Sequence, residues 1–122
     1  MSTGALNFGT VAHWSLWWTF DELFGKEYAA LASFGKPVMV HEFGSLAVGG
    51  DRAAWYRDAL TDLPARYPAV RALLFFNAWE DRTLTYQDVD WSIVEEPGIA
   101  ETIAAGIAGW GVGNTAVPLV NQ

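Results

Sequence analysis

The stretch KPVMVHEFGS, residues 36 to 45, decides how this chain is interpreted, because a short apolar run ends on two polar residues. The apolar triplet VMV predicts a buried strand, since strands covered by helices are hydrophobic without strict alternation. His41 and Glu42 follow at once, and the next residues, FGS, predict a turn. The sequence therefore places a carboxylate at the end of an apolar strand.

Side chains alternate across a strand, so we expect Val38, Val40 and Glu42 to share one face. His41 would then point to the other face, toward covering helices, as a packed histidine. A carboxylate at the carboxyl end of a parallel strand is well placed to meet a ligand. The commoner alternative is a strand-end carboxylate paired with an arginine or a backbone N–H, and both interpretations remain open here.

Two further apolar runs, ALNFG at residues 5–9 and RALLFFN at 71–77, flank the run PVMVHEF at 37–43. The three runs begin about 32 and about 34 residues apart, the length of a strand-helix-strand unit. This spacing predicts a parallel sheet. Thr19 and Glu22 form a capping box, and other apolar residues recur at helical spacing. Three helices are predicted, over residues 20–34, from Asp51 to about Pro64, and from Pro97 to Trp110.

Composition limits the function classes. The formal net charge is −7 with only seven Lys and Arg residues, which argues against a nucleic-acid partner. The chain has no cysteine and 52% hydrophobic residues, so a folded chain without disulfides or thiolate metal sites is expected. No apolar run is long enough to span a membrane, and the start MSTGALNFG lacks signal-peptide features, so we expect no membrane partner and the compartment stays undecided.

Several blocks in the same order resemble the carboxy-terminal part of glycoside hydrolase family 26, the retaining β-mannanase and β-glucanase family. They are FDELFGKEYAALASFGKPVMVHEFGS, GGDRAAWYRDALTDLPARYPAVRALLFFN and DVDWSI, and the resemblance covers about residues 5–93. It implies an α/β fold, a partial (β/α)8 TIM barrel covering about strands six to eight with their helices. Residues 1–110 would form this fragment and residues 111–122 an irregular tail. The resemblance also suggests an extracellular enzyme.

By this resemblance Glu42 falls on the catalytic nucleophile. A retaining glycosidase needs a second, protonated carboxyl group about 5 to 5.5 Å away. No glutamate precedes Glu22, which lies at a predicted helix start, so no acid/base candidate is found in the chain. We therefore expect a fragment of a retaining endo-β-glycanase that acts on β-mannan or β-glucan, inactive when isolated.

Sugar rings stack on aromatic side chains and bind amides, which defines a set of substrate-binding candidates. They follow the predicted strands and comprise Asn7, Trp14, Phe75, Asn77 and Trp79. His13, Trp17 and Trp18 could add further surface. Phe75 stands where the family usually has tryptophan. Each candidate also has a structural alternative, because tryptophan is mostly buried and asparagine commonly caps turns.

No cofactor or metal is expected. Glu80, Asp81, Asp88 and Asp90 match no calcium-loop spacing and are interpreted as solvated loop acids. The expected partner is a polysaccharide or oligosaccharide substrate. Two alternatives remain: a non-catalytic carbohydrate-binding or assembly module, and self-association through the open edges of an incomplete barrel.

Overall fold

The computed structural model describes residues 1–78 and 89–110. Strands and helices alternate along the chain, as predicted, and the strand pairing is parallel. None of the helices in the described ranges has the length and apolar character needed to cross a membrane. The elements are β1 (Ser2–Asn7), α1 (Phe20–Ala32), β2 (Val38–Ser45), α2 (Arg52–Arg66), β3 (Val70–Phe75) and α3 (Pro97–Trp110).

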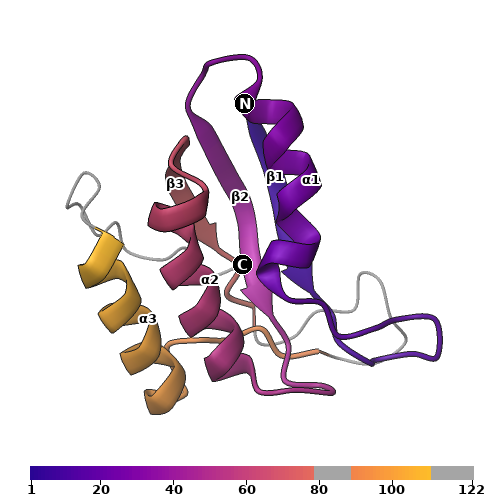
Figure 1. Ribbon diagram of the computed structural model, residues 1–122. Coiled ribbons are helices and arrows are strands. Elements are labelled where there is room, and N and C mark those ends of the chain that lie inside the picture. Colours follow the sequence, from indigo (N-terminus) through magenta and orange to yellow (C-terminus); the bar gives the residue numbers. More distant parts are fainter. Residues whose placement is uncertain (79–88, 111–122) are drawn as a thin grey trace.

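The strands form one sheet in the order β1-β2-β3, with β2 in the centre. Each crossover carries one helix, and right-handed crossovers between neighbouring parallel strands put their helices on the same face. Figure 1 shows α1 beside β1 and α2 between α1 and α3. The other face of the sheet carries no helix from the described residues.

The main core fills the space between the sheet and the helices. Strand residues contribute small and β-branched side chains together with Phe43, and the helices contribute aromatic and aliphatic ones. Phe43 of β2 is fully buried and packs edge-to-face with Phe20 and Phe75, at centroid distances of 5.3 and 5.2 Å. α3 packs on α2, where Gly106 lets the helix backbone approach Leu60: a Cβ at that position would lie 2.5 Å from Leu60 Cδ1.

The expectation of a partial (β/α)8 barrel is wrong. The described strands form an open sheet in which β1 and β3 are each paired on one side only. Barrel closure requires a continuous ring of tilted, staggered strands. The described residues instead form a two-layered α/β unit, a sheet of three strands covered on one face by three helices, with its own core.

The predicted helix starts are confirmed. Thr19 Oγ1 accepts the Glu22 N–H at 3.1 Å, and Glu22 Oε1 accepts the Thr19 N–H at 3.0 Å, which completes the capping box. Asp51 caps α2 by accepting the Ala54 N–H. Pro64 lies inside the last turn of α2, and the helix ends two residues later than predicted, at Arg66.

β2 contains one extra residue relative to β1, and its register with β3 shifts twice, between Val38 and Met39 and between Val40 and Phe43. On the β1 side, Thr3 pairs with Val40 and Gly4 pairs with Glu42, so His41 is left without a partner. Two residues of β2, His41 and Glu42, thus lie opposite one residue of β1, Gly4, and this arrangement defines a β-bulge.

The same irregularity is seen on the β3 side, where Val40 pairs with Leu73 and Phe43 pairs with Phe75. His41 and Glu42 together therefore oppose the single residue between them, Leu74. A bulge in the central strand shifts the alternation for every later position.

The predicted alternation of side chains between the two faces of β2 is consequently wrong at His41 and Glu42. Val38, Val40 and Phe43 are all buried in the helix-facing core, although an unbroken strand would put Phe43 opposite Val40. Glu42 is turned to the helix-free face instead. His41 does not point toward the helices as expected, because its side chain remains 44% exposed beside Glu42.

Candidate functional site

Glu42 projects from the middle of the sheet on the helix-free face. Its side chain is 45% exposed, and Oε1 lies 3.8 Å from His41 Nε2. In the part of the chain that the structure describes, His41 is the only basic side chain within ion-pair distance of Glu42. Glu42 lies three residues before the end of β2 at Ser45, because the residues Phe43, Gly44 and Ser45, which were predicted to turn the chain, continue the strand. The carboxylate is accessible and borders the sheet surface directly.

The surroundings of Glu42 are mainly uncharged. Gly4 lies across the strand pair, and a Cβ there would be 3.7 Å from Glu42 Cβ and 3.8 Å from His41 Nε2. Leu74 of β3, 47% exposed, opposes the bulge on the other side. Met39 is the preceding residue of β2 on this face and is 36% exposed. These contacts make a shallow apolar surface with one carboxylate and one imidazole.

A second hydrophobic cluster closes this face toward the carboxyl ends of the strands. Gly44, the next β2 position, is covered by Trp91, whose Cε3 would lie 3.5 Å from a Cβ at residue 44. Trp91 is fully buried and packs edge-on against Phe8 and Phe76. The buried members of the cluster are Leu46, Ala78, Val89 and Trp91, with Leu6, Phe8, Val11 and Phe76 packed around them.

Asn7 is fully buried at the end of β1. Its Nδ2 donates to Ser45 Oγ at 3.0 Å, and its Oδ1 accepts the backbone N–H groups of Gly9 and Trp18 at 3.2 and 3.0 Å. Both polar atoms of the side chain are thus used inside the chain. The role expected for Asn7 in binding sugar hydroxyls stays a prediction, and the hydrogen bonds add a structural role as the anchor of the loop that follows.

That loop, residues 8–19, is fixed at several points. Thr10 donates its N–H to the Val48 carbonyl at 3.0 Å, Ser15 Oγ donates to the Gly9 carbonyl at 2.6 Å, and Trp55 Nε1 donates to the Trp18 carbonyl at 2.8 Å. Gly9 has φ 64°, and a Cβ there would be 1.9 Å from the Val48 oxygen, so glycine is required. The loop is therefore held against the loop after β2.

Trp14 lies on this anchored loop and is 63% exposed. Leu16 and Trp18 are also exposed, at 57% and 42%, whereas Trp17 is partly buried against the main core. His13 is exposed as well. An indole on a rigid loop can present a flat apolar face at little entropic cost, which is the property that a stacking sugar ring needs.

The three remaining candidates follow β3 or end it. Phe75 packs against Phe43 and Tyr56 in the helix-facing core, so it is not directed to the face that carries Glu42. Asn77 is buried, and its Oδ1 accepts the Ile93 N–H at 3.0 Å. Trp79 lies outside the described residues, as do Glu80, Asp81 and Asp88. The structure thus brings Asn7 and Ser45 together but not Phe75 and Glu42.

A buried polar network that the sequence pattern does not predict begins at Ser45. Tyr56 Oη accepts the Ser45 N–H at 3.2 Å, and Arg52 stacks over the Tyr56 ring at 5.8 Å from its centroid. Burial raises the pKa of the Tyr56 phenol above its ordinary value, against the opposing hydrogen bond from Ser45 and the charge of Arg52. A tyrosine four residues after an arginine at a helix start is a weak signal, which is why the network was not predicted.

Arg52 of α2 forms hydrogen bonds with the segment before α3, residues 91–96. Its Nη1 donates to Glu96 Oε1 at 2.9 Å, and its Nη2 donates to the carbonyls of Trp91 and Ser92 at 3.2 and 3.0 Å. The side chain is 5% exposed, so these bonds offset the desolvation of a cation. The network fixes the segment that covers the helix-free face with Trp91.

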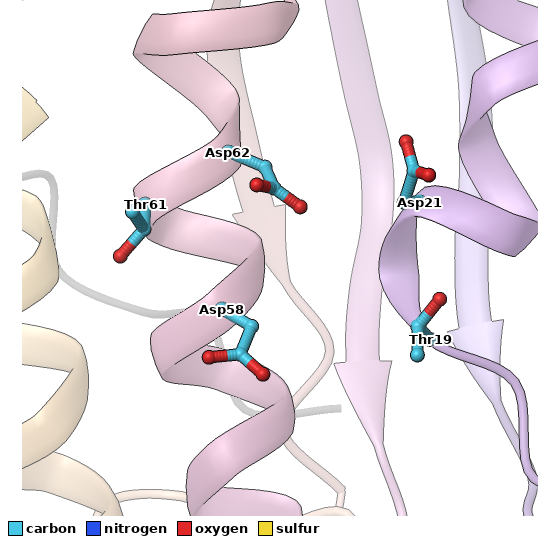
Figure 2. A pocket seen from close by; sticks show the side chains of 5 residues that line it. All are labelled: Thr19, Asp21, Asp58, Thr61 and Asp62. Atoms are coloured by element: carbon cyan, nitrogen blue, oxygen red, sulfur yellow. The ribbon is translucent and has the colours of Figure 1, made fainter.

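A pocket between α1 and α2 collects acidic side chains on the helix side of the molecule (Figure 2). Asp58 and Asp62 come from α2, and Asp21 comes from the first turn of α1. Desolvation raises the pKa of Asp62, opposed by Arg66, which lies 3.1 Å from Asp21 and 3.9 Å from Asp62. The pocket is separated from Glu42 by the sheet, so it is not part of the same site.

Two other described carboxylates, Glu22 and Glu96, serve a helix end and an ion pair. Glu22 completes the capping box, and the hydrogen bonds from Thr19 lower its pKa, which is opposite to what a general acid requires. Glu96 is paired with Arg52. Among residues 1–78 and 89–110, no group of three or more His, Cys, Asp or Glu side chains is arranged to hold a metal ion.

No family profile matches the chain. The chain is similar to part of endoglucanase H of Acetivibrio thermocellus, with 34% identity over 110 residues. The similarity covers 86% of this chain but only 11% of that protein's length. The chain therefore contains a region related to a glycoside hydrolase. The similarity does not distinguish family 26 from other glycosidase families.

Proposed function

We propose that this chain carries the nucleophile of a retaining β-glycanase of the family 26 type, and that Glu42 is that nucleophile. The observation that carries the proposal is the half-exposed Glu42 carboxylate on the helix-free face of a parallel sheet. The relationship to an endoglucanase supports a glycan as the substrate. In this role a Glu42 oxygen attacks the anomeric carbon while the glycosidic oxygen leaves.

The proposal needs a separate acid/base carboxyl group, and we place it outside these 122 residues. The chain spans about a tenth of the endoglucanase it resembles, so further catalytic groups would come from additional sequence. Glu22, the glutamate nearest the start of the chain, is occupied as a helix cap. We therefore expect the isolated chain to release no reducing ends from β-mannan or β-glucan.

The nucleophile can be tested without the acid/base. A 2-deoxy-2-fluoro-glycosyl fluoride carries a leaving group that departs without protonation. The Glu42 carboxylate forms a bond to the anomeric carbon, C1. The bond between C1 and its fluorine breaks, and this fluoride leaves with the electron pair. We expect mass spectrometry to find the sugar on the peptide that contains Glu42, with probes of the gluco or manno configuration.

The matched control is Glu42→Gln, which keeps the size of the side chain and removes the negative charge. Labelling of this variant should be absent. Labelling at another carboxylate, or none on the folded wild-type chain with either probe, would overturn the role of Glu42. The configuration that reacts faster would also indicate whether glucan or mannan is the substrate, which neither composition nor spacing determines.

A second function is favoured by the anchored loop after β1. Trp14 and Trp18 expose indole surface on a loop that is fixed by hydrogen bonds to Asn7 and Trp55, an arrangement suited to binding a glycan without cleaving it. This carbohydrate-binding module would retain its affinity in Glu42→Ala and lose it in Trp14→Ala. Affinity electrophoresis in soluble β-glucan and β-mannan measures both variants.

A further inference from the structure

Gly4 has no structural requirement for glycine that the described residues reveal. Its φ is not in the left-handed region, which among the described glycines is occupied by Gly9, Gly35 and Gly49. A Cβ at residue 4 would make only ordinary van der Waals contacts, at 3.7 to 3.9 Å. Glycine inside a strand nevertheless lowers stability through its conformational entropy. The missing side chain at this position therefore calls for another explanation.

The position of Gly4 supplies that explanation. Gly4 is the β1 partner of Glu42, and the three contacts of its missing Cβ are with Glu42 Cβ, His41 Nε2 and the Glu42 carbonyl oxygen. A side chain at residue 4 would consequently stand on the helix-free face next to the carboxylate. Glycine within a strand often marks a place where a ligand approaches the backbone closely.

We infer that Gly4 is a specificity-determining position, which keeps a space beside Glu42 for one neutral hexopyranosyl unit. This inference rests on the proposed role of Glu42. The floor of the space is β1 at the exposed residue Gly4, and Met39 supplies apolar surface toward the start of β2, whereas Leu74 flanks Glu42 on the far, β3 side. The C–H face of a neutral sugar suits such a surface. An anionic sugar would be repelled by the negative charge of Glu42 and by the net charge of −7.

The test compares side chains of increasing size at residue 4. Gly4→Ala and Gly4→Val add one and three carbon atoms on the helix-free face. Ser2→Val is the matched control, because Ser2 lies on the same strand and face but pairs with Met39 and not with Glu42. β-branched residues favour strands, so the melting temperature of Gly4→Val should equal or exceed that of the wild type. A merely structural role for Gly4 would lower it.

The first readout measures access to the Glu42 carboxylate and does not require glycosidase chemistry. A carbodiimide activates the carboxylate as an O-acylisourea, and an amine then attacks its carbonyl carbon, forms an amide and releases the urea. The amine is either methylamine or glucosamine, and the product is quantified on the Glu42 peptide. We expect glucosamine coupling to fall at least tenfold in Gly4→Val and less in Gly4→Ala. Methylamine coupling should stay within about twofold, and Ser2→Val should behave as the wild type in both reactions.

The second readout is the rate of labelling by the 2-fluoro-glycosyl fluoride, which should fall in the same order. If the wild type couples glucosamine but is never labelled by the fluoride, the nucleophile role fails and the access role of Gly4 stands. If glucosamine coupling in Gly4→Val stays within about twofold of wild type, or if both amines lose the same factor, the inference about Gly4 is overturned.

Discussion

At the scale of single residues, a polar side chain either makes hydrogen bonds inside the fold or stays accessible to a ligand. Glu42 is half exposed and has one basic neighbour, His41, at 3.8 Å. Asn7, by contrast, is buried and makes three hydrogen bonds. Both residues follow or end an apolar run in the sequence, so the hydrophobic pattern alone does not distinguish them. Exposure distinguishes them, because a ligand can reach only a polar atom that is not already bonded inside the fold.

Replacing Asn7 by alanine is expected to lower the free energy of unfolding by about 2 to 4 kcal/mol, since the buried N–H of Gly9 and the part-buried N–H of Trp18 would lose their acceptor. Urea denaturation measures the change. Trp14→Ala is the control, and its effect should be small because that side chain is 63% exposed. A loss below about 0.5 kcal/mol for Asn7→Ala would contradict the anchoring role.

Tyr56 predicts a pH dependence of stability at alkaline pH. Its pKa is raised in the folded state, so its contribution to stability is complete below the unfolded pKa of about 10 and is lost as the pH rises from there toward the folded pKa. The loss is at most about 1.4 kcal/mol per pH unit for one group. Urea unfolding between pH 8 and pH 11 should therefore show a shallower decline for Tyr56→Phe than for the wild type. Equal slopes for the two proteins would contradict this.

At the scale of secondary structure, the β-bulge of β2 is the decisive element. It allows Val40 and Phe43 to pack under the helices while Glu42 and His41 remain on the other face. A regular strand could not satisfy both requirements with this order of residues, because its side chains alternate strictly. Bulges are frequent next to functional sites, where they redirect a side chain.

Deletion of His41 is expected to preserve the fold, with a loss of less than about 1 kcal/mol in the free energy of unfolding. Without His41 the pairs Thr3–Val40 and Gly4–Glu42 become regular neighbours, and no core residue changes face. Deletion of Met39 should be far more damaging, because Val38 or Val40 must leave the core, at about 1.5 to 3 kcal/mol for one valine. Urea denaturation of both variants measures the difference, and equal losses would argue against the bulge.

At the scale of the whole molecule, the helices cover one face of the sheet, and both edges are unpaired within the described residues. Exposed apolar side chains, including Met39 and Leu74, lie on its helix-free face. Open edges and apolar surface favour association with another chain. The net charge of −7 opposes association between copies, most strongly at low ionic strength.

We therefore expect the isolated chain to self-associate, and more strongly at high salt. Sedimentation velocity at about 0.02 M and about 0.5 M NaCl compares weak and strong screening of the charge. Leu74→Lys should reduce association, whereas Val94→Lys, a change at an exposed position before α3, should have a smaller effect. A monomer at both salt concentrations would contradict the expectation.

The local elements could be predicted from the sequence. Thr19 with Glu22 and Asp51 determined where two helices begin, because capping depends on a few neighbouring residues. The three apolar runs and their spacing predicted parallel strands, because a crossover helix requires a minimum length. Glu42 was identified as the carboxylate of interest for the same local reason, a charge that interrupts a buried pattern.

The tertiary structure alone decided which face of the sheet each side chain meets. The direction of Glu42 depends on the bulge at His41, which is defined only by the pairing of β2 with β1 and β3. It likewise decided that Phe75 joins the helix-facing core, and that the strands of residues 1–78 and 89–110 form an open sheet. Capping and periodicity depend on interactions a few residues apart, whereas register, face and closure depend on contacts between distant segments, and only folding brings those together.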